Sequence, residues 1–164
     1  MCNVLVMKMG AGVEWGIHCC LTLAWLEGEG PVPIGRLATW FDLPSEYLKK
    51  RLQVLARAGI LESTPGVQGG FSLGRRPERI TLMDIVAALE GSAGPFQCTE
   101  IRQRGAGGEG AEFTGDCSIK IAMSRAELAW RRELAAQSIA DLMASAPAAS
   151  AERTRRRYAD LASG

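Results

Sequence analysis

The strongest constraint on the fold is a run of short elements between residues 33 and 73. Pro33 precedes a short helix expected over 34–40, and Asp42-Leu43-Pro44 forms a turn after it. Ser45 is a suitable N-cap for the next helix, which continues to Ala58. Gly59 then ends that helix, because glycine readily takes the left-handed conformation of a C′ residue. Two helices joined by so tight a turn favour a helix-turn-helix arrangement.

A glycine-rich hairpin follows these helices. Two strand-like runs, 60–63 and 70–73, are joined by Thr64-Pro65-Gly66-Val67-Gln68-Gly69. An earlier helix is expected over 12–26 and ends near the breaker Gly28-Glu29-Gly30-Pro31. Three helices followed by a hairpin predict a mainly α, winged helix-turn-helix domain over residues 7–90.

Charge is unevenly distributed along the chain. The net charge is only +1, but residues 44–80 carry seven basic and three acidic residues, a local excess of +4. Such an excess on a small module suits a polyanion. In the helix that starts at Ser45, apolar residues form one stripe and basic residues point outward.

These patterns predict binding to double-stranded DNA, with the basic helix in the major groove and the hairpin tip at the minor groove. The candidate contacts lie on that helix, at the hairpin tip and just after the hairpin: Ser45, Tyr47, Lys49, Lys50, Arg51, Arg57, Gln68, Arg75 and Arg76, with Arg79 beside them. A solvated basic face, or a protein-interaction module of the same fold, would produce the same pattern.

The second half of the chain has a different organisation. Thr81-Leu82-Met83-Asp84 resembles a capping box that opens a fourth helix ending at Glu90. A glycine-rich loop over 91–117 contains Cys98 and Cys117. Helical periodicity over 118–144 predicts a long helix whose apolar stripe needs the same helix of a second subunit. Residues 145–164 are expected to form a flexible tail.

The cysteine count indicates reduced thiols. Five cysteines, two of them adjacent at Cys19-Cys20, make a poor disulfide framework, so a cytoplasmic protein is expected. Cys19 and Cys20 are expected in the core, and Cys2 precedes Met7, an alternative start. The sequence has neither a secretion signal nor an apolar run of the roughly eighteen residues that a membrane span requires. It also lacks a nucleophile motif and a phosphate loop, so an enzyme is not expected.

Several spaced segments resemble the IscR/NsrR-type bacterial transcription regulators. They are 45–48 (SEYL), 55–61 (LARAGIL), 66–73 (GVQGGFSL) and 76–86 (RPERITLMDIV), and the similarity extends from about residue 7 to 143. The resemblance implies a homodimer crossed by the long helix, with an iron–sulfur cluster in the loop before it. Many members carry three closely spaced cysteines in this loop, whereas this chain has two, so either other ligands are required or there is no cluster.

Segments 14–20 (EWGIHCC) and 98–105 (CTEIRQRG) are similar to the RsrR-type [2Fe–2S] redox sensors of this family. That resemblance implies that Glu14 and His18 of one subunit and Cys98 and Cys117 of the other hold a [2Fe–2S] cluster whose state controls operator binding. A helix places residues four apart on one face, although most Glu–His pairs at this spacing are surface contacts.

Three alternatives stay open at this point. Glu112 and Asp116 are spare carboxylates, and either would serve as a ligand in place of Glu14 if Glu14 does not bind. Zinc suits the same four ligands. A cluster-free regulator would instead respond to a small molecule, a partner protein or thiol oxidation.

Overall fold

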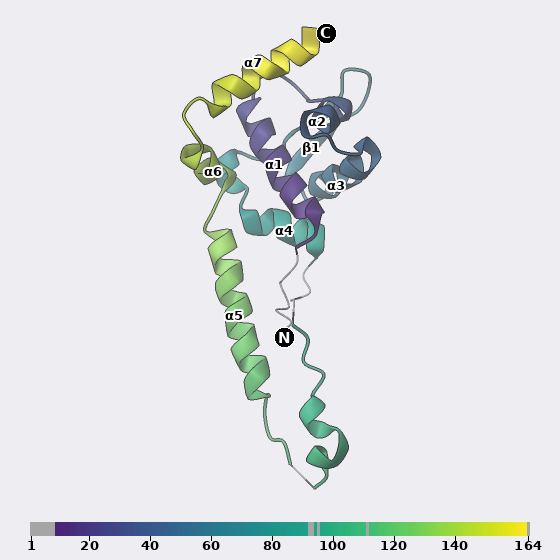
Figure 1. The fold of residues 1–164 in the computed structure, drawn as a ribbon, viewed down its shortest axis with the longest axis vertical. Coiled ribbons are helices and arrows are strands. Elements are labelled where there is room, and N and C mark those ends of the chain that lie inside the picture. Colours follow the sequence, from purple (N-terminus) through teal and green to yellow (C-terminus); the bar gives the residue numbers. More distant parts are fainter. Residues whose placement is uncertain (1–8, 92–93, 95, 111, 164) are drawn as a thin grey trace.

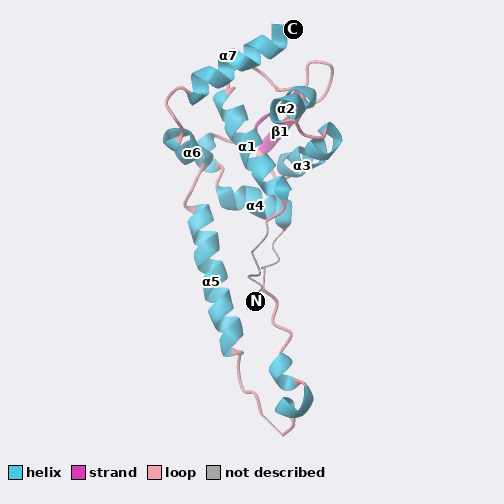
Figure 2. Cartoon of the chain, in the orientation of Figure 1, coloured by secondary structure: helices cyan, strands magenta, loops and turns pink. Residues whose placement is uncertain are grey.

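The structure is a computed structural model that describes residues 9–91, 94, 96–110 and 112–163. Cys2 lies outside the described residues. A body made from residues 9–91 and 136–163 carries a long stem made from the loop and helix between these two ranges (Figure 1). Helices dominate, and the described part contains one two-stranded sheet (Figure 2). Within these residues no helix is long and apolar enough to cross a membrane.

The body has the predicted winged-helix order. Its elements are α1 (Ala11–Trp25), α2 (Ile34–Phe41), α3 (Ser45–Arg57), β1 (Leu61–Thr64), β2 (Gly70–Leu73), the 3-10 turn η1 (Pro77–Arg79) and α4 (Leu82–Glu90). Leu48, Leu52 and Leu55 are fully buried along one side of α3 and anchor it in the core. The opposite side of α3 is left facing solvent, which is the arrangement that a recognition helix requires.

Cys19 and Cys20 are core residues, as predicted. Both are fully buried within α1. Burial raises the pKa of the Cys19 thiol to about 12 and that of Cys20 as well, because a thiolate is poorly solvated there. Neither thiol is therefore suited to bind a metal as a thiolate.

The hairpin depends on two glycines at its tip. Strands β1 and β2 pair antiparallel from Leu61–Leu73 to Thr64–Gly70. A Cβ on Gly69 would lie 2.1 Å from the Thr64 carbonyl oxygen, and one on Gly70 would lie 2.2 Å from the Val32 carbonyl oxygen. Val32 bridges to Phe71 beside that point and ties the wing to the body.

The N-terminal cap of α3 differs from the expectation, whereas that of α4 agrees with it. Pro44 occupies the N-cap of α3, and Ser45 is the first helical residue, with no side-chain cap bond in the described structure. The capping box at α4 is confirmed: Asp84 N–H donates to Thr81 Oγ1 at 3.1 Å, and Thr81 N–H donates to Asp84 Oδ2 at 3.0 Å. Gly59 has the predicted positive φ, 71°.

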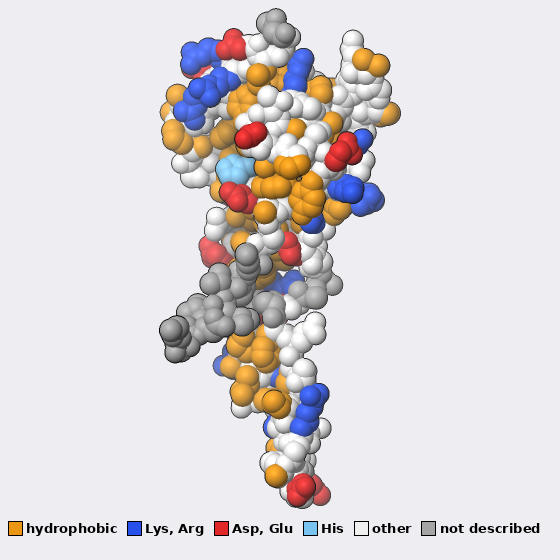
Figure 3. All heavy atoms as spheres, turned by 45° about the vertical axis from the view of Figure 1, so that its right-hand side comes forward, with side chains coloured by type: hydrophobic (Ala, Val, Ile, Leu, Met, Phe, Trp, Pro, Cys, Tyr) orange, Lys and Arg blue, Asp and Glu red, His pale blue; other side chains and the backbone are white. Residues whose placement is uncertain are grey.

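The stem consists of the 91–117 loop and α5 (Ser118–Ala135). The loop contains two short 3-10 turns, η2 (Ile101–Gln103) and η3 (Gly105–Gly108), and leads away from the body before α5 returns (Figure 1). Within the described chain, no residue of α5 is buried. Its most exposed large apolar side chains are Ile119, at 63%, and Ile121 and Leu128, at 47% each. Hydrophobic side chains accordingly gather along the stem in Figure 3.

The long helix expected over 118–144 is divided in the structure. The backbone at 137–139 pairs with the segment before α4: Leu82 N–H donates to the Gln137 carbonyl and Ile139 N–H donates to the Ile80 carbonyl, both at 2.9 Å. These bonds replace helical ones. A second capping box, in which Ser138 and Asp141 bond reciprocally, then starts α6 (Ile139–Ser145).

Where a flexible tail is expected, the structure has a further helix, α7 (Ser150–Ser163). It packs on the body through Thr154 and Tyr158, which are 5% and 7% exposed. Arg155 Nε donates to the Trp25 carbonyl at 2.9 Å and so caps the end of α1. The arginine-rich composition of this segment hides these anchors from sequence inspection.

Candidate DNA interface and metal centre

The exposed face of α3 carries most of the candidate DNA contacts. Lys49, Lys50 and Arg57 are exposed, and Tyr47 is 42% exposed. Ser45 lies half-buried at the start of the helix. The cations are thus free to meet phosphate groups along one helix face.

Tyr47 and Arg51 also connect α3 to α1. The guanidinium of Arg51 lies 4.8 Å from the Tyr47 ring centroid and donates to the Tyr47 hydroxyl. The Trp15 ring meets the Tyr47 ring edge-on at 5.3 Å. Arg51 also lies over Gly12, where a Cβ would come within 3.0 Å of Arg51 Nε. The N-terminal half of α1 therefore contacts the recognition helix directly, a link that sequence spacing does not reveal.

The wing tip presents Val67 and Gln68 to solvent. Val67 is fully exposed and Gln68 is exposed beside it. Gly66 has a φ of 101°, so the turn needs a residue that tolerates the left-handed region. An exposed, glycine-bounded tip can approach a groove closely.

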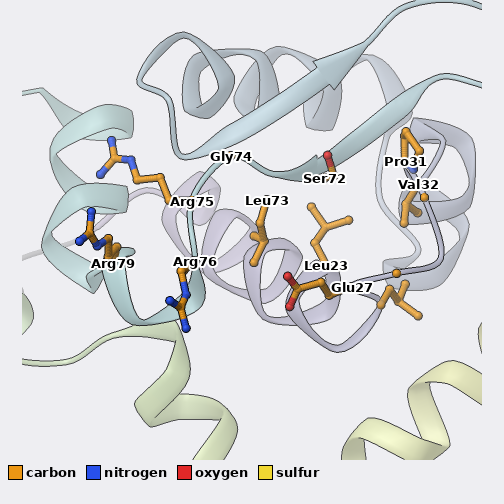
Figure 4. A pocket seen from close by; sticks show the side chains of 13 residues that line it. Leu23, Glu27, Pro31, Val32, Ser72, Leu73, Gly74, Arg75, Arg76 and Arg79 are labelled. Atoms are coloured by element: carbon orange, nitrogen blue, oxygen red, sulfur yellow. The ribbon is translucent and has the colours of Figure 1, made fainter.

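The arginines at the base of the wing differ in what they contact. Figure 4 shows Arg75 and Arg76 leaving the end of β2 in different directions. Arg75 donates to the carbonyls of Ala58 at 2.8 Å and Gly59 at 3.0 Å, and lies 3.7 Å from Asp84. The side chain of Arg76 is 82% exposed. Arg76 is thus available to DNA, whereas Arg75 is engaged in holding the end of α3.

Glu14 and His18 form the first pair of candidate metal ligands. Both are exposed on one face of α1, as their spacing predicts. They line the same hollow of about 290 Å³, together with Val13 and Ile17. The His18 ring lies 6.0 Å from the Phe41 ring.

Cys98 and Cys117 belong to the second pair, in the stem. Cys98 Sγ lies 3.7 Å from Glu100 Oε1, and Glu100 Oε2 accepts from Arg102 Nε at 2.8 Å. The charge of Arg102 interacts with both cysteines. Arg102 Nη2 also donates to the Gly115 carbonyl at 2.6 Å, which ties the two ends of the loop together.

The environment of Cys117 favours a thiolate. Cys117 is the N-cap of α5. The backbone N–H groups of Lys120 and Ile119 lower the pKa of its thiol, and the nearby Arg102 guanidinium adds to that effect. The thiolate is the form of cysteine that binds a metal ion or reacts with an oxidant.

One subunit does not bring the two pairs together. Within the described residues, no group of three or more His, Cys, Asp or Glu side chains could hold a metal ion. Among the spare carboxylates, Asp116 is bound to Lys120 Nζ at 2.9 Å and Glu112 is exposed. The donor types themselves fit a mixed-ligand iron–sulfur or zinc centre, since thiolate, imidazole and carboxylate all bind these metals.

Sequence inspection assigns no metal role to Glu100, which the structure places beside Cys98. Its φ of 50° is unusual for a residue other than glycine. Such backbone conformations gather at functional sites, where the surrounding contacts enforce them. Here the Glu100 carboxylate contacts both Cys98 and Arg102.

Comparison with known proteins reveals a family match. The model of a family described as "Rrf2: Iron-dependent Transcriptional regulator" matches residues 9–145. The chain is 38% identical over 90 residues to the regulator slr0846 of Synechocystis, covering 55% of this chain and 61% of that protein. It is 34% identical over 94 residues to CymR of Bacillus subtilis (57% and 68% covered) and 27% identical over 137 residues to NsrR of Geobacillus kaustophilus (84% and 90%).

Solved structures agree with that match. The structure of B. subtilis CymR, described as the global cysteine regulator, has a TM-score of 0.69 at 25% identity and covers 87% of this chain and all of its own. T. potens IscR has a TM-score of 0.67 at 25% identity, covering 89% of this chain and 93% of its own. The fold is thus that of winged-helix regulators.

Proposed function

Because the chain belongs to the Rrf2 family and is therefore a DNA-binding transcriptional regulator rather than an enzyme, we propose that it senses redox state. In this proposal, two copies of the chain share a [2Fe–2S] cluster, and the state of that cluster controls operator binding. We also propose that the protein resembles the RsrR-type sensors more closely than other members of the family, and that it acts in the cytoplasm.

The observation that carries the proposal is the division of the candidate ligands into two separate pairs, Glu14 and His18 exposed on α1 and Cys98 and Cys117 half-buried in the stem. Glu14 and His18 share one hollow on α1. Cys98 and Cys117 share the electrostatic environment of Arg102 in the stem. Two half-sites that are incomplete in one chain become complete when a second chain supplies the other half.

The stem supports a homodimer. Its helix α5 leaves Ile119, Ile121 and Leu128 exposed in one chain. A helix with an uncovered apolar stripe needs a partner, and closed two-fold dimers are the commonest solution. Two-fold symmetry would set two α3 helices against the two halves of a palindromic operator.

The donor chemistry suits a redox sensor. When bound, a [2Fe–2S] cluster supplies reversible one-electron redox chemistry, and fewer thiolate ligands raise its reduction potential. Cys117 binds as a thiolate, favoured by the N-terminus of α5. Cys98, whose thiol donates to Glu100 Oε1 at 3.7 Å, would supply the second sulfur ligand. Glu14 and His18 supply the remaining oxygen and nitrogen donors.

A chain of contacts runs from this site to the DNA. Trp15 follows Glu14 in α1 and packs against Tyr47 of α3 at 5.3 Å. Tyr47 in turn orients Arg51. A shift of Glu14 would therefore move the face that carries Lys49 and Lys50, and half-site spacing makes operator affinity sensitive to small rotations.

The first test is anaerobic purification followed by visible absorbance and iron and sulfide analysis. The protein should be coloured, with equal iron and sulfide. Alanine at Glu14, His18, Cys98 or Cys117 should each remove the colour. Glu112→Ala, an exposed loop carboxylate, is the matched control and should keep it. Colour retained in any of the four variants would remove that residue from the ligand set.

The second test is a gel shift with oxidised, reduced and metal-free protein. Operator affinity should differ among the three states, because the cluster links two subunits. Equal affinity in all three states would refute redox control while leaving DNA binding itself intact.

A cluster-free or zinc-containing regulator is the alternative. The similarity to CymR, a cysteine regulator by its description, supports it. The lowered pKa of Cys117 is also what a thiol sensor requires. Colourless protein that contains zinc, or colourless metal-free protein whose DNA binding responds to thiol oxidation, would select this alternative.

A further inference from the structure

Helix α7 lies beyond the segment that the family model matches. The family match ends at residue 145, and α7 begins at Ser150. The helix is nevertheless firmly attached. Arg36 of α2 donates to the Tyr158 hydroxyl at 3.1 Å and lies 5.3 Å from the ring centroid, while Arg155 caps α1. A helix outside the matched segment that is fixed to both α1 and α2 encloses surface that the matched segment alone does not.

The helix does not close fully against the body. A cavity of about 790 Å³ remains between α1, α2 and α7. Trp25, Trp40, Phe41 and Leu161 contribute apolar walls, with Leu21 beside them. Cavities of roughly 300–1,000 Å³ with apolar and aromatic walls are typical of small-molecule sites.

The cavity also has unpaired charges. Arg153, Arg157 and Asp160 of α7 all line it. In the described part of the chain, none of the three takes part in an ion pair. Their sum is +1, so the cavity is complementary to one negative charge next to an apolar body.

We propose that this cavity binds a small aromatic monocarboxylate, with its ring between Trp25 and Trp40 and its carboxylate at Arg157 and Arg153. An arginine fork suits a carboxylate, and indole rings provide large flat apolar surfaces. The inference concerns a second, effector site and goes beyond redox sensing.

The position of the cavity gives the ligand a route to the regulator's output. His18 of α1 lines it, and residues of α2 in the helix-turn-helix line it as well. An occupant would therefore hold α7 against α2 and contact the same histidine that belongs to the proposed metal site. Only this last connection rests on the proposed function, because binding itself requires no metal.

The test uses the full-length protein, with 3-phenylpropionate as the probe and calorimetry plus tryptophan fluorescence as readouts. The acid should bind and change the emission, since two of the four tryptophans line the cavity. The uncharged isostere 3-phenylpropionamide should bind about tenfold or more weakly, because it lacks the charge-assisted contacts.

Arg157→Gln should weaken binding of the acid by about tenfold and leave binding of the amide unchanged. Arg156→Gln is the matched control, an exposed neighbour on the same helix that does not line the cavity. Both arginines are exposed, so both variants should fold. Absence of binding, equal binding of acid and amide, or equal losses in the two variants would overturn the proposal. All of these outcomes are measured on metal-free protein, so failure here is separable from failure of the cluster.

Discussion

Arg75 and Arg76 are neighbours at the base of the wing, and replacing each by alanine should have a different consequence. Loss of Arg75 should lower stability, and loss of Arg76 should weaken DNA binding. Arg75 donates to two carbonyls at the end of α3, at 2.8 and 3.0 Å, while its side chain is 37% exposed. A charge-assisted hydrogen bond contributes roughly 1.5–3 kcal/mol when well shielded. Solvent exposure reduces that, and the ion pair with Asp84 adds under about 1 kcal/mol.

Arg75→Ala should therefore destabilise the fold by about 1–2 kcal/mol, which for a chain of this size lowers the melting temperature by roughly 2–8 °C. Arg76, with a side chain 82% exposed, should change stability by less than about 0.5 kcal/mol on replacement. Instead, Arg76→Ala should weaken DNA binding at every sequence, because it removes a cation that meets phosphate. The slope of log affinity against log salt concentration should become shallower by about one for each phosphate that is no longer neutralised.

Thermal unfolding by circular dichroism measures the first effect, and operator titration at several salt concentrations measures the second. Equal melting temperatures for Arg75→Ala and the unmodified protein would refute the capping role. A salt slope unchanged by Arg76→Ala would remove Arg76 from the DNA interface.

Further predictions concern packing, thiol reactivity and α7. Gly16→Ala should be less stable than Gly35→Ala by about 1 kcal/mol or more, because the Cβ at residue 16 would lie 2.8 Å from Leu89 Cδ1 and 3.3 Å from Ile85 Cγ2. Gly35 has nothing within 4 Å, and both changes gain the same helix propensity, so equal melting temperatures of the two variants would contradict the packing. In metal-free protein at neutral pH, iodoacetamide should modify Cys117, because the lowered pKa of its thiol leaves more thiolate. Buried Cys19, whose pKa is raised to about 12, should be spared. Mass spectrometry that shows Cys19 modified first would contradict this prediction. Tyr158→Ala should release α7 and speed tryptic cleavage there several-fold, whereas an unchanged digestion pattern would mean that Tyr158 does not anchor it.

The body was predictable because its signals are local. Gly59 and the Thr81 capping box mark helix boundaries by their own chemistry, and the buried leucines of α3 follow a helical period. The break before α6 was not predictable in the same way. It depends on backbone bonds between Gln137 and Leu82, residues far apart in the sequence. Tertiary pairing there overrides a helical period that continues across the break.

In the candidate site, too, local features were predictable from the sequence and long-range contacts were not. Spacing predicts that Glu14 and His18 share a face, and they do. It does not reveal that Cys117 caps a helix or that Glu100 lies beside Cys98, because both depend on how the loop folds back on itself. The docking of α7 through Tyr158 was likewise hidden, since one buried tyrosine among exposed arginines leaves little periodic signal.

The central claim is that each metal centre takes one ligand pair from each subunit, and a mixed dimer tests it most directly. One subunit carries Glu14→Ala with His18→Ala, the other carries Cys98→Ala with Cys117→Ala, and two affinity tags isolate the mixed dimer under anaerobic conditions. Each double variant alone should be colourless. The mixed dimer rebuilds one of its two sites, so iron, sulfide and visible absorbance should return to half of the unmodified level. A mixed dimer that is folded, dimeric and colourless would contradict the shared site.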